Sequence, residues 1–302
     1  MILVTGANGF VGSHLVARLR KDGIAVRALV RNPSRAGRLT ALGVEIVPGD
    51  ISDTASLEAA ASGCDRVIHI VGIIQEGKGF TFRSVHVDGT RNVLDAAKKA
   101  GVKQFFHQSA LGTREDAKSQ YHRTKWEAEK LVKAGGIPYT ILRPSLIYGP
   151  GDQFTIRLAD AIRFSPVLPV IGSGRSKVQP IHIDDVTACI RKAVTSDAYL
   201  NGTYEIGGPE QLTYEEVSKA VAAALGVRRP TVHMPMLFMR TMARVAGAVL
   251  PKPPVTTDQL IMLQEDNVCD PENIREAFGI EPVRFAEGLA RFLGKDRAGD
   301  AD

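Results

Sequence analysis

The sequence predicts an α/β protein in which a doubly wound parallel sheet carries a smaller C-terminal lobe. Three observations lead to this prediction. The chain opens on a short apolar run that breaks into three spaced glycines, and strands then alternate with helical patterns through the first half. After residue 150 this rhythm loosens among prolines and glycines. Alternation with short connections is typical of a parallel sheet with helices on both faces.

The first unit of this pattern is the most informative. Residues 3–12 read LVTGANGFVG, and an apolar-periodic helix is expected over 13–19. A helix start offers unpaired backbone N–H groups and the positive end of its dipole. Three glycines permit a tight turn, close approach of a phosphate and close packing of the helix. We therefore predict a Rossmann-type dinucleotide site whose first residues are Gly6, Asn8, Gly9, Phe10, Val11 and Gly12.

The other elements follow in order. Further strands are expected over 25–30, 44–47, 66–74, 103–108 and 139–143, and helices over 56–61, 82–100 and 119–134. Later come a strand at 181–183, a helix at 184–194 with Asp184 as its N-cap, a strand at 203–206 and a helix at 214–225. The predicted domains are a nucleotide-binding domain over 1–150, to which 179–196 returns, a substrate lobe over 151–295 and a frayed tail over 296–302.

Composition limits the kind of protein. With 302 residues, 44% hydrophobic and 24% charged, the chain resembles an ordinary globular protein. Its net charge of +5 forms no concentrated basic stripe, so no nucleic-acid partner is expected. The first strand begins at residue 1 or 2, and no apolar run has the length of a membrane span. Together with the widely spaced Cys64, Cys189 and Cys269, this predicts a cytoplasmic protein with reduced thiols and no metal site.

The end of the second strand predicts which cofactor is bound. An acidic residue there accepts the ribose hydroxyls of NAD, whereas an arginine matches the 2′-phosphate of NADP. Here the strand is followed by Arg31 and Arg35, without an acid. We expect NADP(H) to be preferred over NAD(H), with a solvated basic loop as the alternative. Asp50, after the third strand, either meets the adenine edge or is an exposed turn residue.

Tyr121 and Lys125 form a Y-x-x-x-K pair within a helical pattern. Residues four apart share a helix face, and a nearby ammonium lowers a tyrosine pKa from about 10 towards values useful for acid–base work. We predict Tyr121 as proton donor or acceptor, with Lys125 as its electrostatic partner and as a ligand of the nicotinamide ribose. A chance pairing is the alternative.

Taken together, segments 5–12, 121–125 and 143–151 resemble the extended and atypical short-chain dehydrogenases/reductases, which are epimerase/dehydratase-like. Segments 70–76, 81–90 and 178–185 are similar to the branch related to the NADPH-binding accessory subunit of respiratory complex I. The resemblance implies NADP(H) binding and extends the expected cofactor residues to Ile51, Val71, Gly72, Lys125 and Pro144.

The chain departs from that family at two catalytic positions. Typical members combine a Ser or Thr, the Tyr, the Lys and an Asn. Here Ala110 occupies the hydroxyl position, Ser109 lies one place earlier as a weaker contributor, and His86 stands at the Asn position. The leading hypothesis is hydride transfer to or from a small or moderately apolar carbonyl or alcohol. The alternatives are a non-catalytic NADPH-binding assembly or sensor protein and a nucleotide-sugar epimerase or dehydratase.

Residues 235–250 are rich in apolar residues and carry only Arg240 and Arg244 as charges. They predict either a helix buried against the lobe, or a methionine-rich wall for an apolar small-molecule substrate or a membrane-surface contact. Pro251, Pro253 and Pro254 would end this helix and form the hinge of a lid. Homo-oligomer formation is left open.

Overall fold

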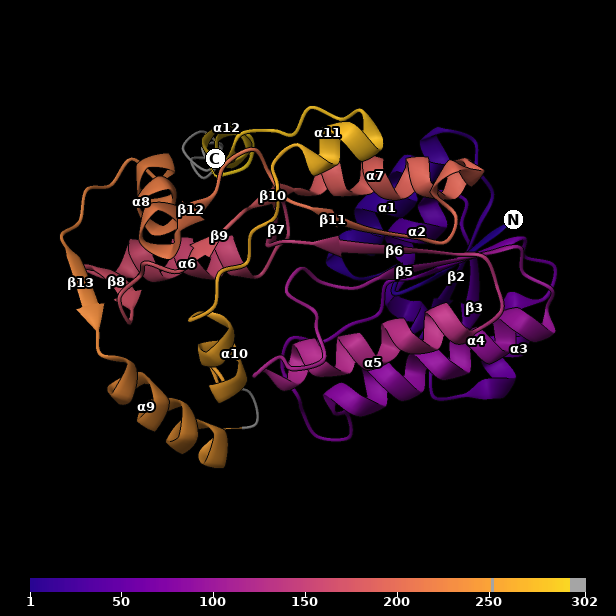
Figure 1. Ribbon diagram of the computed structural model, residues 1–302, viewed down its shortest axis with the longest axis horizontal. Coiled ribbons are helices and arrows are strands. Elements are labelled where there is room, and N and C mark those ends of the chain that lie inside the picture. The colour runs from indigo at the N-terminus through magenta and orange to yellow at the C-terminus, as the bar shows by residue number, and fades with distance from the viewer. Residues whose placement is uncertain (251–252, 294–302) are drawn as a thin grey trace. The chain divides into compact units, whose positions relative to one another are not determined.

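The computed structural model describes residues 1–250 and 253–293, which form two compact units (Figure 1). The first holds Met1–Arg143 and Thr187–Tyr204, and the second holds Pro144–Val186 and the residues from Glu205 onward. The chain thus leaves the first unit at residue 143 and returns at 187, because 147–148 pair with 181–182 inside the second unit. The predicted tail, 296–302, lies outside the described residues, as does Pro251.

A seven-stranded sheet combines the six strands of the first half of the chain with one strand from the second half. Its order is β11-β6-β5-β4-β1-β2-β3, and neighbouring strands from β6 to β3 run parallel. The strands are β1 (Ile2–Thr5), β2 (Val26–Val30), β3 (Glu45–Pro48), β4 (Arg66–His69), β5 (Gln104–Gln108), β6 (Tyr139–Pro144) and β11 (Gly202–Ile206). β1 therefore lies between β2 and β4, and its carboxyl end is flanked by the loops that follow both of them.

Helices cover both faces of this sheet. In Figure 1, α3, α4 and α5 lie on one side, whereas α1 and α7 lie on the other. An ion pair of 3.3 Å between Arg191 and Asp22 joins α7 to the end of α1. The helical segments are α1 (Phe10–Lys21), η1 (Pro33–Arg35), α2 (Gly37–Ala41), α3 (Thr54–Ala61), η2 (Arg83–Asp88), α4 (Gly89–Lys99), α5 (Gln120–Ala134), α7 (Ile183–Thr195) and η3 (Asp197–Tyr199).

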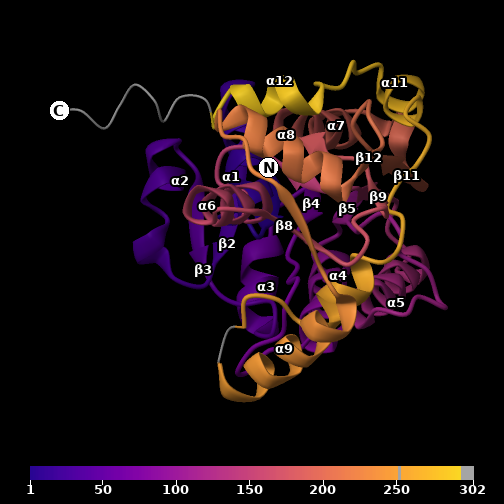
Figure 2. The same ribbon diagram turned by 90° about the vertical axis from the view of Figure 1, so that its left-hand side faces the viewer.

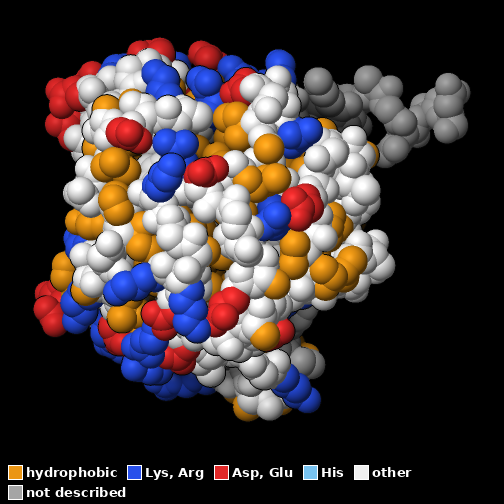
Figure 3. All heavy atoms as spheres, turned by 90° about the vertical axis from the view of Figure 1, so that its right-hand side faces the viewer, with side chains coloured by type: hydrophobic (Ala, Val, Ile, Leu, Met, Phe, Trp, Pro, Cys, Tyr) orange, Lys and Arg blue, Asp and Glu red, His pale blue; other side chains and the backbone are white. Residues whose placement is uncertain are grey.

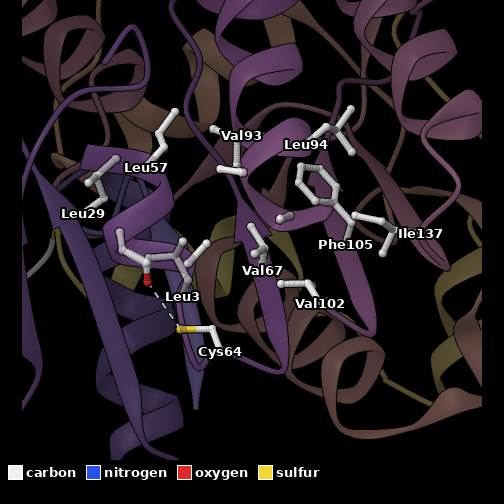
Figure 4. Close-up of a cluster of buried hydrophobic side chains, with 14 of the residues drawn as sticks. Leu3, Leu29, Leu57, Cys64, Val67, Val93, Leu94, Val102, Phe105 and Ile137 are labelled. Carbon is white, nitrogen blue, oxygen red and sulfur yellow. Dashed lines mark hydrogen bonds between the residues drawn. The ribbon is translucent and has the colours of Figure 1, made fainter. Parts of the chain in front are cut away.

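The core of the first unit fills the space between the sheet and α3 and α4 (Figure 4). Leu3, Val67 and Phe105 project from neighbouring strands towards Leu57 of α3 and Val93 of α4. Each is almost fully buried, and burying such a side chain contributes about 1.5–3 kcal/mol. This packing fixes the carboxyl ends of the central strands, where the candidate site lies.

The second unit is built from short paired strands and six helices in the described part of the chain. The pairs are β7 (Ile147–Tyr148) with β10 (Ile181–His182), β9 (Lys177–Val178) with β12 (Leu212–Thr213), and β8 (Leu168–Ile171) with β13 (Thr231–Met234). The helices are α6 (Phe154–Phe164), α8 (Tyr214–Ala224), α9 (Met236–Val249), α10 (Thr257–Met262), α11 (Asn273–Phe278) and α12 (Phe285–Ala290).

Tyr148 anchors the core of this second unit. Its ring lies 4.8 Å from that of Phe285, and its hydroxyl donates to the carbonyl oxygen of Arg284 at 3.3 Å. Burial raises its pKa above the ordinary tyrosine value. Tyr148 is therefore a packing residue.

Three local predictions are wrong. β4 ends at His69 and not at residue 74, because the chain leaves the sheet there. The helix predicted over 82–100 begins with a π-helical turn, η2. α7 begins at Ile183, so Asp184 lies in its first turn and is not the cap; instead His182 Nδ1 accepts the Asp184 N–H at 3.2 Å.

Candidate functional site

The glycine turn joins β1 directly to α1. Gly6 has a φ of +87°, and the Gly9 N–H donates to the Gly6 carbonyl oxygen at 2.9 Å. A Cβ on Gly12 would collide with the Gly6 carbonyl oxygen and the Ala7 backbone. Gly9 caps the helix without a side-chain hydrogen bond, and the first turn holds no acid. This helix start therefore suits an anion, as the cradle of a pyrophosphate requires.

The loop after β4 connects the glycine turn to the Tyr/Lys helix. A Cβ on Gly6 would lie 3.2 Å from the backbone of Ile70 and Val71. One on Gly72 would lie 3.2 Å from Lys125 Nζ. Small residues thus bring the turn, the loop and a buried ammonium group into a continuous surface at the carboxyl edge of the sheet.

Lys125 is buried on α5 with its ammonium close to Gly72. Its Nζ donates to the Gln108 carbonyl oxygen at 2.9 Å. Burial lowers its pKa to about 8, and the negative charge of Glu129 opposes that shift. Since an ammonium has three donors, two remain for a ligand.

Glu129 and Arg143 hold α5 against the sheet. Arg143 donates from Nε and Nη2 to the two carboxylate oxygens of Glu129 at 2.8 and 2.7 Å. Glu129 is fully buried, and such bidentate pairs fix geometry well. Sequence reasoning missed this pair, because its members lie 14 residues apart in different elements.

Tyr121 lies on α5 one turn before Lys125. Its ring meets the edges of His86 at 5.4 Å and Phe82 at 6.0 Å between centroids. Burial raises the pKa of Tyr121 to about 12. The expected lowering of this pKa is therefore wrong for the chain alone, since removal of the phenol from water is the dominant effect.

His86 holds the loop after β4 to α5. Its Nε2 accepts the Ile73 N–H at 3.1 Å, and its Nδ1 lies 2.9 Å from Thr124 Oγ1. Accepting at Nε2 requires a neutral ring with the proton on Nδ1. Burial and the nearby Lys125 charge lower its pKa to about 2. The π-helical turn that carries His86 belongs to a class often found at functional sites.

Ser109 is buried just past the end of β5. Its N–H donates to the Leu142 carbonyl oxygen at 2.8 Å, and its hydroxyl donates to Thr113 Oγ1 at 3.4 Å. Ala110, which follows, offers no hydroxyl. The Ser109 hydroxyl is thus engaged with a neighbouring side chain.

The basic residues after β2 are exposed. The Arg31 side chain is 80% exposed, with its Nε 3.9 Å from Asp50 Oδ2, and Arg35 lies in η1. Asp50 Oδ1 accepts from the Ser52 N–H at 2.8 Å, so Asp50 also shapes its own turn.

The other expected cofactor residues divide by burial. Asn8 is exposed, and Phe10 and Val11 are half-buried in the first turn of α1. Ile51 packs on Gly89 of α4, and Pro144 is buried as the last residue of β6. Whether each of these residues binds a cofactor stays a prediction.

Two further buried histidines lie behind the site, on β4 and β5. His69 Nδ1 is 2.7 Å from Thr5 Oγ1 and its Nε2 is 3.1 Å from Thr90 Oγ1. The His107 ring stacks on that of His69 at 5.6 Å. Burial lowers the pKa of His69 to about 3 and that of His107 well below its usual value. In the sequence, each stands at the last or next-to-last residue of an apolar strand, and this position could have indicated that both lie near the site.

Other expectations concern metals and thiols. Within residues 1–250 and 253–293, no group of three His, Cys, Asp or Glu side chains is arranged to hold a metal ion. Cys64, Cys189 and Cys269 are free and buried. In the same described ranges, no helix has the length and apolar character needed to cross a membrane.

Comparison with known proteins identifies the family of this chain. Residues 6–161 match the NAD(P)H-binding family, and the chain belongs to that family, in its atypical short-chain dehydrogenase/reductase and epimerase-like part. A ceramide reductase of Caulobacter vibrioides is 34% identical over 239 residues, which cover 78% of this chain and 74% of that protein. The mitochondrial NADH-ubiquinone oxidoreductase 40 kDa subunit of Neurospora crassa is 27% identical over 300 residues, covering 98% and 79%.

A solved structure gives the same result for the fold. The NADPH-dependent quinone oxidoreductase QOR2 of Escherichia coli superposes with a TM-score of 0.76 at 22% identity, covering 96% of this chain and 99% of the other. The predicted fold class and the predicted family are both confirmed. The relatives include reductases, and NAD(P)H is the cofactor class.

Proposed function

We propose that this protein is an NADP(H)-dependent oxidoreductase that transfers hydride to or from a small or moderately apolar carbonyl or alcohol in a reducing cytoplasm. The observation that carries the proposal is the continuous contact from Gly6 through Val71 and Gly72 to Lys125. It joins an anion-binding helix start to the pair that would carry out acid–base chemistry.

The residues divide the work as follows. The backbone around Gly9 binds the diphosphate, and the two remaining donors of Lys125 bind ribose hydroxyls. Tyr121, whose pKa is raised to about 12, is protonated at neutral pH and so is a proton donor to a carbonyl oxygen during reduction. Lys125 is charged at neutral pH and stabilises negative charge that develops nearby. When bound, the nicotinamide supplies or accepts the hydride.

The exposed Arg31 supports NADP(H) as the preferred cofactor, because a guanidinium fork matches a phosphate. Titration of NADPH and NADH by fluorescence tests this point. Arg31→Ala should weaken NADPH binding by about 10- to 100-fold and leave NADH binding nearly unchanged. Arg91→Ala, an equally charged change on α4, is the control. Equal loss for both nucleotides would contradict a phosphate contact.

The catalytic part is tested with a carbonyl panel under single-turnover conditions. Tyr121→Phe should lower the rate of NADPH oxidation by at least about 100-fold while NADPH affinity is kept. A Tyr121→Phe variant that keeps the full rate would rule out this role.

A non-catalytic NADPH-binding role is the second candidate. The engagement of Ser109 with Thr113, the missing hydroxyl at Ala110 and the double hydrogen bonding of His86 favour it. Tight retention of NADPH that no carbonyl of the panel oxidises would select this candidate.

A further inference from the structure

Helix α9 exposes an unusual amount of apolar surface. Leu237 is 78% exposed, Val245 60% and Val249 75%, and Phe238 and Met242 are each about half exposed. Isolated exposed apolar residues are common, but a continuous group on one helix marks an interaction surface.

The helix buries only a narrow stripe within the second unit. Met239 and Ala243 pack on Leu260 of α10, with Met236 beside them. The prediction of a helix buried against the lobe is therefore wrong for most of its circumference. Phe238, Met242, Val245 and Val249 follow an i, i+4, i+7, i+11 spacing, so they share a second, exposed face. We call these four residues the α9 apolar face.

Helix α9 itself carries positive charge and no acid. Arg240 and Arg244 are exposed on α9 and lie four residues apart on a third side of the helix. Arg240 donates from Nη2 to Gln264 Oε1 at 3.1 Å, so one of the two guanidinium groups already has a neutral partner on the protein.

The other surface that can be seen is different in character. On the face shown in Figure 3, hydrophobic side chains are dispersed among both positive and negative groups. Helix α9 differs from that face, because its apolar side chains are continuous and its charged side chains are all arginines.

We infer that α9 docks on an anionic lipid bilayer, lying in the plane of the headgroups. The α9 apolar face would enter the boundary of the acyl chains, and Arg240 and Arg244 would reach lipid phosphates. A second copy of this chain, docked α9 to α9, fits less well, because it would bring the arginines of two helices without acids together. The described helix is too short to span a bilayer, so the contact is peripheral.

The test is flotation of the full chain with vesicles of phosphatidylcholine alone or with added phosphatidylglycerol. Binding is expected to the anionic vesicles, and it should weaken about 10-fold between 0.1 and 0.5 M salt. Phe238→Glu with Val245→Glu should reduce binding at least 10-fold. Arg240→Gln with Arg244→Gln should reduce it on the order of 10-fold, and the remaining binding should depend less on salt.

Leu42→Glu, at an exposed leucine in the first unit, is the matched control and should bind as the parent does. Thermal unfolding and NADPH titration show that each variant is folded. Equal binding to both vesicle types, or equal loss in the Leu42 variant, would overturn the inference. So would self-association that the Phe238/Val245 variant abolishes in the absence of vesicle binding, since α9 would then join two copies.

Discussion

At the scale of single residues, the candidate site depends on glycines, which have no side chain, as much as on its larger residues. Gly6, Gly12 and Gly72 each leave space that backbone or the Lys125 ammonium occupies. Lys125 in turn remains ionisable at a buried position, so its charge is sensitive to its surroundings. These residues therefore give the clearest tests.

Gly12→Ala should weaken both the fold and nucleotide binding. The added methyl group collides with the Gly6 carbonyl oxygen, which is backbone and cannot move aside cheaply. We expect a loss of about 1–3 kcal/mol in the free energy of unfolding and at least a 10-fold rise in the Kd for NADPH. Urea unfolding and fluorescence titration measure these changes. Gly37→Ala, where an added Cβ meets nothing within 4 Å, is the control and should be tolerated.

Lys125→Met should change how stability depends on pH. The folded-state pKa of Lys125, about 8, lies below its unfolded value of about 10.5. Between these values the unfolded chain binds more protons, so the stability of the parent rises with pH, by about 1–3 kcal/mol. Urea unfolding at pH 7.5, 9 and 10 should show this rise in the parent and in Lys133→Met, but not in Lys125→Met. Parallel profiles for all three would contradict it.

At the scale of elements, the sequence predicted most of what local patterns can specify. Glycine spacing and apolar periodicity located β1, α1 and α5 to within a few residues, because turn chemistry and helix faces are local properties. Three features depended on tertiary contacts: the early end of β4 at His69, the π-turn around His86 and the Glu129–Arg143 pair. No local pattern encodes those contacts, so they could not be derived in advance.

The Glu129–Arg143 pair fastens the element that carries Tyr121 and Lys125. Glu129→Gln removes a buried charge and leaves Arg143 without its carboxylate, so we expect a loss of about 3–5 kcal/mol in the free energy of unfolding. The negative charge that raises the Lys125 pKa is also lost, so that pKa should fall further. If the Lys125 ammonium binds the ribose as proposed, NADPH affinity should decline as this group loses its proton at alkaline pH, and in Glu129→Gln that decline should occur at lower pH.

Urea unfolding and NADPH titration from pH 6.5 to 9 measure both effects. Glu127→Gln is the matched control on the same helix, because its ion pair with Arg83 is exposed and should contribute at most about 1 kcal/mol. If the pH profile of NADPH binding is the same in Glu129→Gln as in the parent, the Glu129–Arg143 pair does not influence Lys125 in nucleotide binding.

At the scale of the molecule, the first unit is built around neutral histidines. His69, His86 and His107 all have pKa values far below the ordinary 6.5, chiefly because burial disfavours the charged ring. The folded chain therefore keeps these three buried histidines uncharged, whereas the unfolded chain can protonate them. The first unit should therefore be sensitive to acid well before its carboxylates titrate.

The lowered histidine pKa values make the protein less stable in acid. Below pH 6.5 the unfolded chain binds protons that the folded chain does not bind, so the free energy of unfolding falls as pH falls. Each histidine contributes a slope of up to about 1.4 kcal/mol per pH unit, so the three together contribute up to about 4 kcal/mol per unit.

Trp126 is the only tryptophan and lies on α5, so its fluorescence during urea unfolding reports on this unit. His107→Leu should reduce the slope between pH 6.5 and 4.5 by about a third. Because neither ring nitrogen of His107 has a hydrogen-bond partner in the described structure, this change should leave stability at pH 7.5 unchanged or higher. His233→Gln, at an exposed histidine, should keep the full slope. A His107→Leu variant as acid-sensitive as the parent would show that the acid transition has another origin.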